Sequence, residues 1–161
     1  MDARRSGEKN PTTVERTSER EVTVTRTFNG PAHIVFKAWT TPELFTRWWL
    51  PKSMSMALRS CTMDVRVGGQ YRLVFEPDGM AFFGTYTEVV PPSRLVWTND
   101  EGGDEASITT VTFEETDGRT RLVMRELYPS KEALDAAGMG AAEATIETFA
   151  QLDELLASVG A

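Results

Sequence analysis

Residues 130–159 read SKEALDAAGMGAAEATIETFAQLDELLASV, and the rest of the sequence is interpreted around them. Apolar residues recur there every three or four positions, which predicts one long helix from Ser130 to Val159, kinked near Gly138 and Gly140. The predicted core-facing stripe consists of Met139, Ala142, Ile146, Phe149, Leu152, Leu155 and Leu156. Its first turns carry small residues and its later turns large ones. We therefore expect space at one end of the core, although a tapering helix without a cavity explains the same composition.

The composition is that of an ordinary globular protein. The 161 residues suit one domain, with 40% hydrophobic residues, 25% charged residues and a net charge of −7. This acidic balance, without clustered Lys and Arg, argues against nucleic acid. No segment predicts membrane insertion, and Met1–Glu19 lacks the apolar centre of a signal peptide. A single cysteine, Cys61, excludes an internal disulfide, so we expect a cytoplasmic protein.

The polar residues 1–19 predict a disordered N-terminal tail, and residues 20–161 the folded domain. Residues from Val22 to Phe28 alternate between apolar and polar, which is typical of a strand with one buried face. Arg26 falls in the apolar phase. It is either an edge residue that reaches water or a polar group inside a cavity.

Two short helices are expected next. Pro31 fits the first position of one, and Thr41-Pro42 the cap and start of the other. Gly68-Gly69 predicts a two-residue hairpin loop after a strand that ends at Val67. The further strands are expected near Cys61–Val67, Gln70–Glu76, Ala81–Val90, Leu95–Trp97, Ala106–Glu114 and Thr120–Tyr128. This order favours an α+β fold in which a curved antiparallel sheet of about seven strands wraps around the last helix.

Several segments together resemble the family related to the activator of heat-shock protein 90 ATPase, within the START-like helix-grip (SRPBCC) superfamily. They are Phe28-Asn29-Gly30-Pro31, Ala38-Trp39-Thr40-Thr41-Pro42-Glu43, Trp48-Trp49 before Pro51, Asp64-Val65-Arg66-Val67-Gly68-Gly69 and Val89-Val90-Pro91-Pro92-Ser93-Arg94-Leu95. The resemblance spans about Val22 to Ala157 and implies a START/Bet v-like helix-grip fold. That superfamily also holds polyketide cyclases and lipid carriers, so fold alone does not give function.

Two differences from the family pattern bear on function. Many relatives carry a Trp in the first turns of the last helix, where this chain has Ala, Thr and Gly, and its absence implies a larger pocket. The eukaryotic co-chaperone has an additional N-terminal domain that this length does not accommodate. A chaperone partner is therefore doubtful.

Little in the sequence predicts catalysis. His33 is the only histidine, so no multi-histidine metal site is expected, and we assign no catalytic residue, metal or cofactor. Tyr71, Tyr86, Glu126 and Tyr128 are candidates to project into the cavity and orient a ligand. The predicted ligand-binding residues are Trp39, Trp48, Trp49, Met63, Tyr71, Phe83, Tyr86, Trp97, Met139, Ala142, Ile146 and Phe149.

We therefore expect the domain to bind a small hydrophobic or amphipathic molecule between the sheet and the last helix, in a carrier, sensor or stress-response role. Two alternatives stay open. A cyclase- or aromatase-like enzyme would need a cavity acid or base, with Glu126 and Tyr71 or Tyr86 as candidates. A chaperone-associated interaction module would have a filled core and an exposed apolar patch. Homodimer formation is left open as well.

Overall fold

The computed structural model describes residues 11–54, 57–76, 79–100 and 106–159. Its elements are β1 (Thr13–Arg16), β2 (Glu21–Phe28), α1 (Ala32–Thr40), α2 (Pro42–Trp48), the 3-10 turn η2 (Lys52–Met54), β3 (Ala57–Met63), β4 (Gln70–Glu76), β5 (Ala81–Val90), β6 (Arg94–Asn99), β7 (Ser107–Thr116), β8 (Arg119–Leu127), α3 (Lys131–Ala137), α4 (Gly140–Glu143) and α5 (Thr145–Val159).

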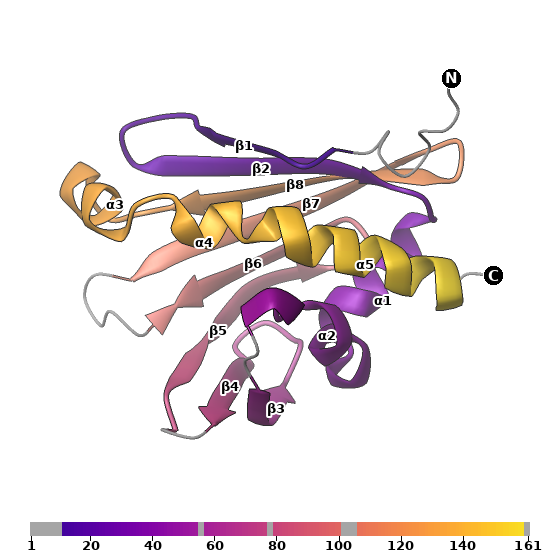
Figure 1. The fold of residues 1–161 in the computed structure, drawn as a ribbon, viewed down its shortest axis with the longest axis horizontal. Helices are drawn as coiled ribbons and strands as arrows, with labels where there is room; N and C mark the ends of the chain where they lie inside the picture. The colour runs from indigo at the N-terminus through magenta and orange to yellow at the C-terminus, as the bar shows by residue number, and fades with distance from the viewer. Residues whose placement is uncertain (1–10, 55–56, 77–78, 101–105, 160–161) are drawn as a thin grey trace.

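The described strands form one antiparallel sheet in the order β1-β2-β8-β7-β6-β5-β4-β3. Figure 1 shows α5 lying across one face of this curved sheet, with α1 and α2 beside the C-terminal half of α5. The predicted α+β helix-grip architecture is confirmed. The sheet has eight strands rather than about seven.

The additional strand, β1, lies in the segment that was expected to be a tail. It pairs with β2 from Thr13 opposite Thr25 to Arg16 opposite Val22. An edge strand needs only backbone hydrogen bonds and few apolar side chains, and of this strand only Val14 packs against the core. The tail prediction is therefore wrong from Thr13 onward, and residues 1–10 lie outside the described part of the chain.

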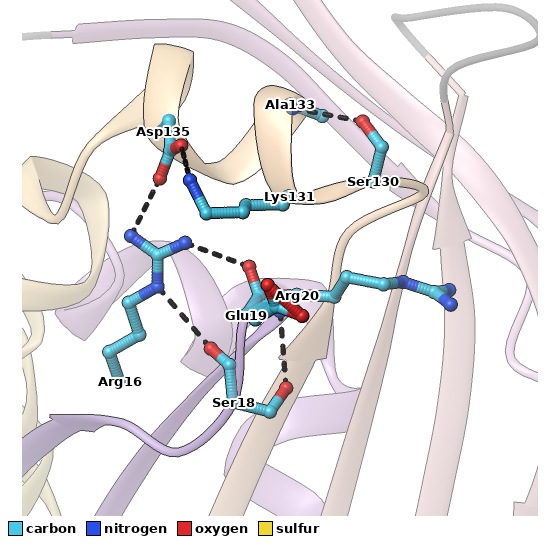
Figure 2. Close-up of polar contacts among 8 residues, drawn as sticks. All are labelled: Arg16, Ser18, Glu19, Arg20, Ser130, Lys131, Ala133 and Asp135. Atoms are coloured by element: carbon cyan, nitrogen blue, oxygen red, sulfur yellow. Dashed lines mark hydrogen bonds and ion pairs between the residues drawn. The ribbon is translucent and has the colours of Figure 1, made fainter.

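The turn between β1 and β2 is fastened to α3, as Figure 2 shows. The Arg16 guanidinium donates a hydrogen bond to the Glu19 carbonyl at 2.8 Å and pairs with Asp135 at 2.8 Å. Lys131 pairs with the same carboxylate at 2.7 Å, and these two cations lower the pKa of Asp135. Exposed ion pairs stabilise a fold only slightly, so their role here is to position α3 beyond the end of β8.

Both short helices form where the prolines predicted them, with one shift. Pro42 is the first residue of α2, whereas Pro31 precedes α1 as its N-cap. The first free backbone N–H of α1, on Ala32, donates to the Glu115 carboxylate of β7 at 2.8 Å. This contact ties the start of α1 to the sheet, because helix N-termini leave such donors unpaired.

The predicted long C-terminal helix is broken into α3, α4 and α5. Gly138 ends α3 with a φ of +70°, a conformation that costs glycine little, and α4 has only four residues. Residue 144 separates α4 from α5. The expectation of one kinked helix is therefore wrong, although the glycines do mark the break.

The buried face of α5 also differs from the predicted stripe. Phe149, Leu152, Leu155 and Leu156 are buried as expected, but Ile146 is 53% exposed. The reason is that polar side chains share the buried face: Thr145, Thr148 and Gln151 are all buried. An apolar pattern alone therefore placed the centre of the face too close to Ile146.

The connection between β3 and β4 is longer than the predicted two-residue hairpin. β3 ends at Met63, and the loop from Asp64 to Gly69 closes with a hydrogen bond from the Asp64 N–H to the Gln70 carbonyl at 3.0 Å. A Cβ on Gly69 would lie 1.9 Å from the Asp64 carbonyl oxygen, so this position needs glycine for close approach. Within this loop, Asp64 and Arg66 form an ion pair at 2.9 Å.

Arg26 holds the last helix to the sheet. Its guanidinium pairs with Asp153 of α5 at 3.2 Å and donates to the Thr12 hydroxyl at 3.0 Å, and the residue is 7% exposed. It is therefore neither of the two expected types, an exposed edge residue or a cavity group. Removing one member of such a buried pair leaves the other charge uncompensated.

Candidate functional site

A cavity of about 410 Å³ lies between the sheet and the helices. Most of its surface is aromatic or aliphatic, and a smaller part is polar. The lining residues are Trp39, Phe45, Trp48, Trp49, Met63, Tyr71, Leu73, Phe82, Tyr86, Trp97, Asn99, Ser107, Thr109, Met124, Glu126, Tyr128, Thr145, Thr148 and Phe149.

Aromatic rings form much of the apolar wall. The Trp39 ring, from α1, lies 4.9 Å from that of Trp48 and 6.1 Å from those of Trp97 and Phe149. These separations and tilts are those that aromatic pairs favour. Trp48 donates its indole N–H to the Ala38 carbonyl at 3.0 Å, which fixes α2 against α1. Helices α1, α2 and α5 and strand β6 therefore share one aromatic cluster.

The end of α2 is held to α5 by Gln151. Its amide nitrogen donates to the carbonyls of Trp48 (2.9 Å) and Leu50 (2.8 Å), and its amide oxygen accepts from the Lys52 N–H at 2.9 Å. A buried amide with these three partners is a satisfied polar group. Gln151 thus positions the segment that presents Trp48 and Trp49 to the cavity.

The polar end of the cavity is organised around Asn99, the last residue of β6. Its side-chain oxygen accepts from the Tyr71 hydroxyl at 2.8 Å and from the Trp97 indole N–H at 3.1 Å. Its side-chain nitrogen lies 3.1 Å from the Ser107 hydroxyl and 2.9 Å from that of Thr109, and donates to both. One amide therefore joins side chains from β4, β6 and β7.

Gly84 allows Tyr71 to reach Asn99. Gly84 pairs with Tyr71 on one side and with Asn99 on the other. A Cβ at this position would lie 1.7 Å from the Thr98 carbonyl oxygen and 2.7 Å from the Tyr71 ring. Only glycine leaves room for the ring to lie across the strand.

Glu126 contributes the carboxylate of this polar end. It lies opposite Thr109 in the β7–β8 register and accepts a hydrogen bond from the Ser107 hydroxyl at 3.1 Å. Tyr128, just after β8, is also hydrogen-bonded to Glu126. Burial, the charge of Glu126 and this hydrogen bond raise the pKa of Tyr128 to about 12. Tyr128 is fixed by a backbone hydrogen bond of 2.7 Å to the Arg20 carbonyl.

Tyr86 is the third tyrosine of the cavity. It is 3% exposed, and burial, followed by the nearby Cys61 thiol, raises its pKa well above the ordinary range. Both Tyr86 and Tyr128 therefore stay protonated at neutral pH and are suited to donate hydrogen bonds. The sequence-based expectation that Tyr71, Tyr86, Glu126 and Tyr128 reach the cavity agrees with this arrangement.

Eight of the twelve predicted ligand-binding residues line the cavity. These are Trp39, Trp48, Trp49, Met63, Tyr71, Tyr86, Trp97 and Phe149. Phe83 is on the opposite face of β5, over the Arg72 guanidinium, and its neighbour Phe82 lines the cavity instead. Met139 and Ala142 lie near the α3–α5 break without lining the cavity, and Ile146 points to solvent.

Sequence reasoning missed most of the polar lining, including Asn99, Ser107, Thr109 and Thr148. Single polar residues at strand ends carry no pattern of their own. The available signal was the alternation along β6 and β7: Trp97 and Asn99 share a face, and Ser107 and Thr109 share another. Only the strand register shows that the two pairs lie on the same side of the sheet, with Trp97 opposite Thr109 and Asn99 opposite Ser107.

Neither a metal site nor a membrane-spanning helix is found in the described part of the chain. Among the described residues, no group of three or more His, Cys, Asp and Glu side chains is arranged to hold a metal ion. His33 is exposed at the start of α1. Within the described ranges, the helices are too short or too polar to cross a membrane.

Comparison with known proteins identifies the family. The sequence profile described as Activator of Hsp90 ATPase homolog 1-like protein matches residues 29–157, which is more than half of the chain. No curated protein matches the chain significantly.

Several solved structures share this fold over nearly their whole length. A protein from Rhodobacter sphaeroides is 26% identical with a TM-score of 0.81, covering 92% of this chain and 99% of its own. Protein Ms6760 from Mycobacterium smegmatis is 28% identical with a TM-score of 0.76, covering 91% and 97%. Protein NE0264 from Nitrosomonas europaea is 25% identical with a TM-score of 0.76, covering 88% and 96%.

Proposed function

We propose that this chain, which belongs to the Activator of Hsp90 ATPase homolog 1-like family of START-like helix-grip proteins, binds a small, mainly apolar molecule as a carrier or sensor. The observation that carries the proposal is the cavity between the sheet and α5. Its volume of about 410 Å³ falls within the range of small-molecule sites. Aromatic walls with a few convergent polar groups are also typical of such sites.

The interaction-module alternative is less well supported. Such a module gains nothing from an unfilled interior, because unfilled volume beside apolar side chains costs packing energy. Here the sheet, α1, α2 and α5 leave a cavity of ligand size where a filled core would be more stable. A ligand that occupies the cavity would restore those contacts.

A cyclase-like enzyme is the second candidate, and Glu126 favours it. A carboxylate inside a largely apolar cavity is a candidate general base. However, its carboxylate already accepts hydrogen bonds from Ser107 and Tyr128, and the raised pKa values of Tyr86 and Tyr128 make both hydroxyls poor bases at neutral pH. These contacts suit orientation of a bound molecule better than proton abstraction.

Native mass spectrometry of the freshly purified chain tests the proposal. We expect a second species, heavier by the mass of one small molecule, that disappears after extraction with organic solvent. A flavonoid or polyketide-like probe added to the extracted protein should then bind saturably at micromolar concentration, which corresponds to about −8 kcal/mol. If no bound mass is found and a broad lipophilic panel gives no saturable binding, the interaction module becomes the better explanation.

A further inference from the structure

The charge of the cavity lining restricts what the cavity accepts. Among the described lining residues there is no Lys, Arg or His, and the one side chain that carries a charge at neutral pH is Glu126. A ligand with a negative head group would thus enter a cavity that offers it no cation. Burying an unpaired charge is strongly unfavourable.

Glu126 lies at the polar end of the cavity, two strands away from Trp97 of the aromatic wall. Across the sheet, Glu126 is opposite Thr109, and Thr109 is opposite Trp97. The Ser107 hydroxyl donates to its carboxylate at 3.1 Å, and Tyr128 is hydrogen-bonded to it as well. These hydroxyl donors stabilise the ionised carboxylate. The polar end of the cavity is therefore negative and rich in hydroxyl groups.

The polar groups at this end of the cavity differ in whether they can bind a ligand. The Asn99 amide, with its four hydrogen-bond partners, is already satisfied within the protein. A carboxylate has about four lone-pair sites, so Glu126 can accept a hydrogen bond from a ligand in addition to those from Ser107 and Tyr128. At the Glu126 carboxylate, a head group that donates a hydrogen bond is matched, and a head group that only accepts is not.

We propose that the ligand is an amphipathic molecule whose apolar body lies against the tryptophan wall and whose head group donates a hydrogen bond to Glu126 and carries no negative charge. Alcohols, phenols and amines meet this description, whereas fatty-acid anions do not. Like charges a few ångströms apart in a partly dry cavity repel each other strongly enough to weaken binding on the order of tenfold or more. This inference rests on the proposed function.

Three probes with the same tail separate the possibilities: 1-decanol, decylamine and decanoate, used below their aggregation concentrations at neutral pH. Binding is measured by the fluorescence of the four tryptophans, all of which line the cavity. The parent protein should bind decanol and decylamine at least about tenfold more tightly than decanoate. Glu126→Gln keeps the shape and removes the charge, and should narrow the ratio of decanol to decanoate affinity to within a few-fold.

Glu154→Gln is the matched control, because Glu154 is exposed on α5 and its replacement changes the net charge by the same amount. Its head-group selectivity should equal that of the parent. Equal or tighter binding of decanoate by the parent overturns the inference, even if Glu126→Gln fails to fold. Equal changes in the two variants also overturn it. If none of the three probes binds, the proposed function itself fails.

Discussion

Replacing Thr145 with tryptophan should close the cavity without unfolding the protein. Thr145 lies at the start of α5, is 9% exposed and lines the cavity. An apolar cavity of about 150 Å³ accommodates benzene, and an indole is larger. Thr145→Trp therefore leaves roughly 260 Å³ of the 410 Å³ cavity, below the roughly 300 Å³ typical of ligand pockets. We expect at least a tenfold loss of affinity, or about 1.4 kcal/mol.

Isothermal titration calorimetry with the flavonoid probe is the assay, because a new indole would confound a fluorescence readout. Ile146→Trp is the control: the next residue along α5 is 53% exposed, so the same side chain there should leave binding unchanged. The melting temperatures of both variants should stay close to that of the parent. The new ring enters existing space in Thr145→Trp and lies at the surface in Ile146→Trp, so neither variant overpacks a filled core. Unchanged binding by Thr145→Trp, or an equal loss in both variants, would show that the cavity is misplaced.

Phe149→Ala should lower the free energy of unfolding by roughly 3–5 kcal/mol, because this ring is 1% exposed, whereas Ile146→Ala should be nearly neutral. Chemical denaturation of both variants checks this. Similar losses in the two would mean that the buried face of α5 is assigned to the wrong residues. Deleting residues 1–19 should lower the melting temperature by several degrees, since the deletion removes β1 and the Thr12 partner of Arg26. An unchanged melting temperature would contradict the pairing of β1 with β2. For Tyr128, the raised pKa means that the native state holds the phenol proton more tightly, so this contribution to stability is complete below pH about 10 and is lost as pH rises towards about 12. Tyr128→Phe should lose less stability than the parent across that alkaline range, and denaturant midpoints that fall equally in both proteins would refute the assignment.

The order of the elements could be predicted from the sequence because each has a local signal. Backbone geometry explains these signals: the alternation along β2 and β4, the proline at the start of α2 and the glycine at the end of α3. β1 has no such signal. Its pairing depends on the exposed edge of β2, which is a property of the assembled sheet.

The same distinction explains what could be predicted of the cavity. Aromatic lining residues such as Trp39 and Trp97 were identified because large apolar side chains near a core are conspicuous in any sequence. Phe83 and Ile146 were assigned to the wrong face, since choosing between adjacent positions requires the register of β5 and the true centre of the buried face of α5. Asn99, Ser107 and Thr109 come together only across two strand pairs.

Binding inside the cavity is tested most directly by following the four tryptophan indole N–H signals in nuclear magnetic resonance spectra while 1-decanol is added. Trp39, Trp48, Trp49 and Trp97 all line the cavity, although they come from different elements. We expect their signals to shift together and to saturate with one dissociation constant in the micromolar range or below. Indole signals that do not shift, or that shift without ever saturating, would contradict a ligand-binding cavity in this protein.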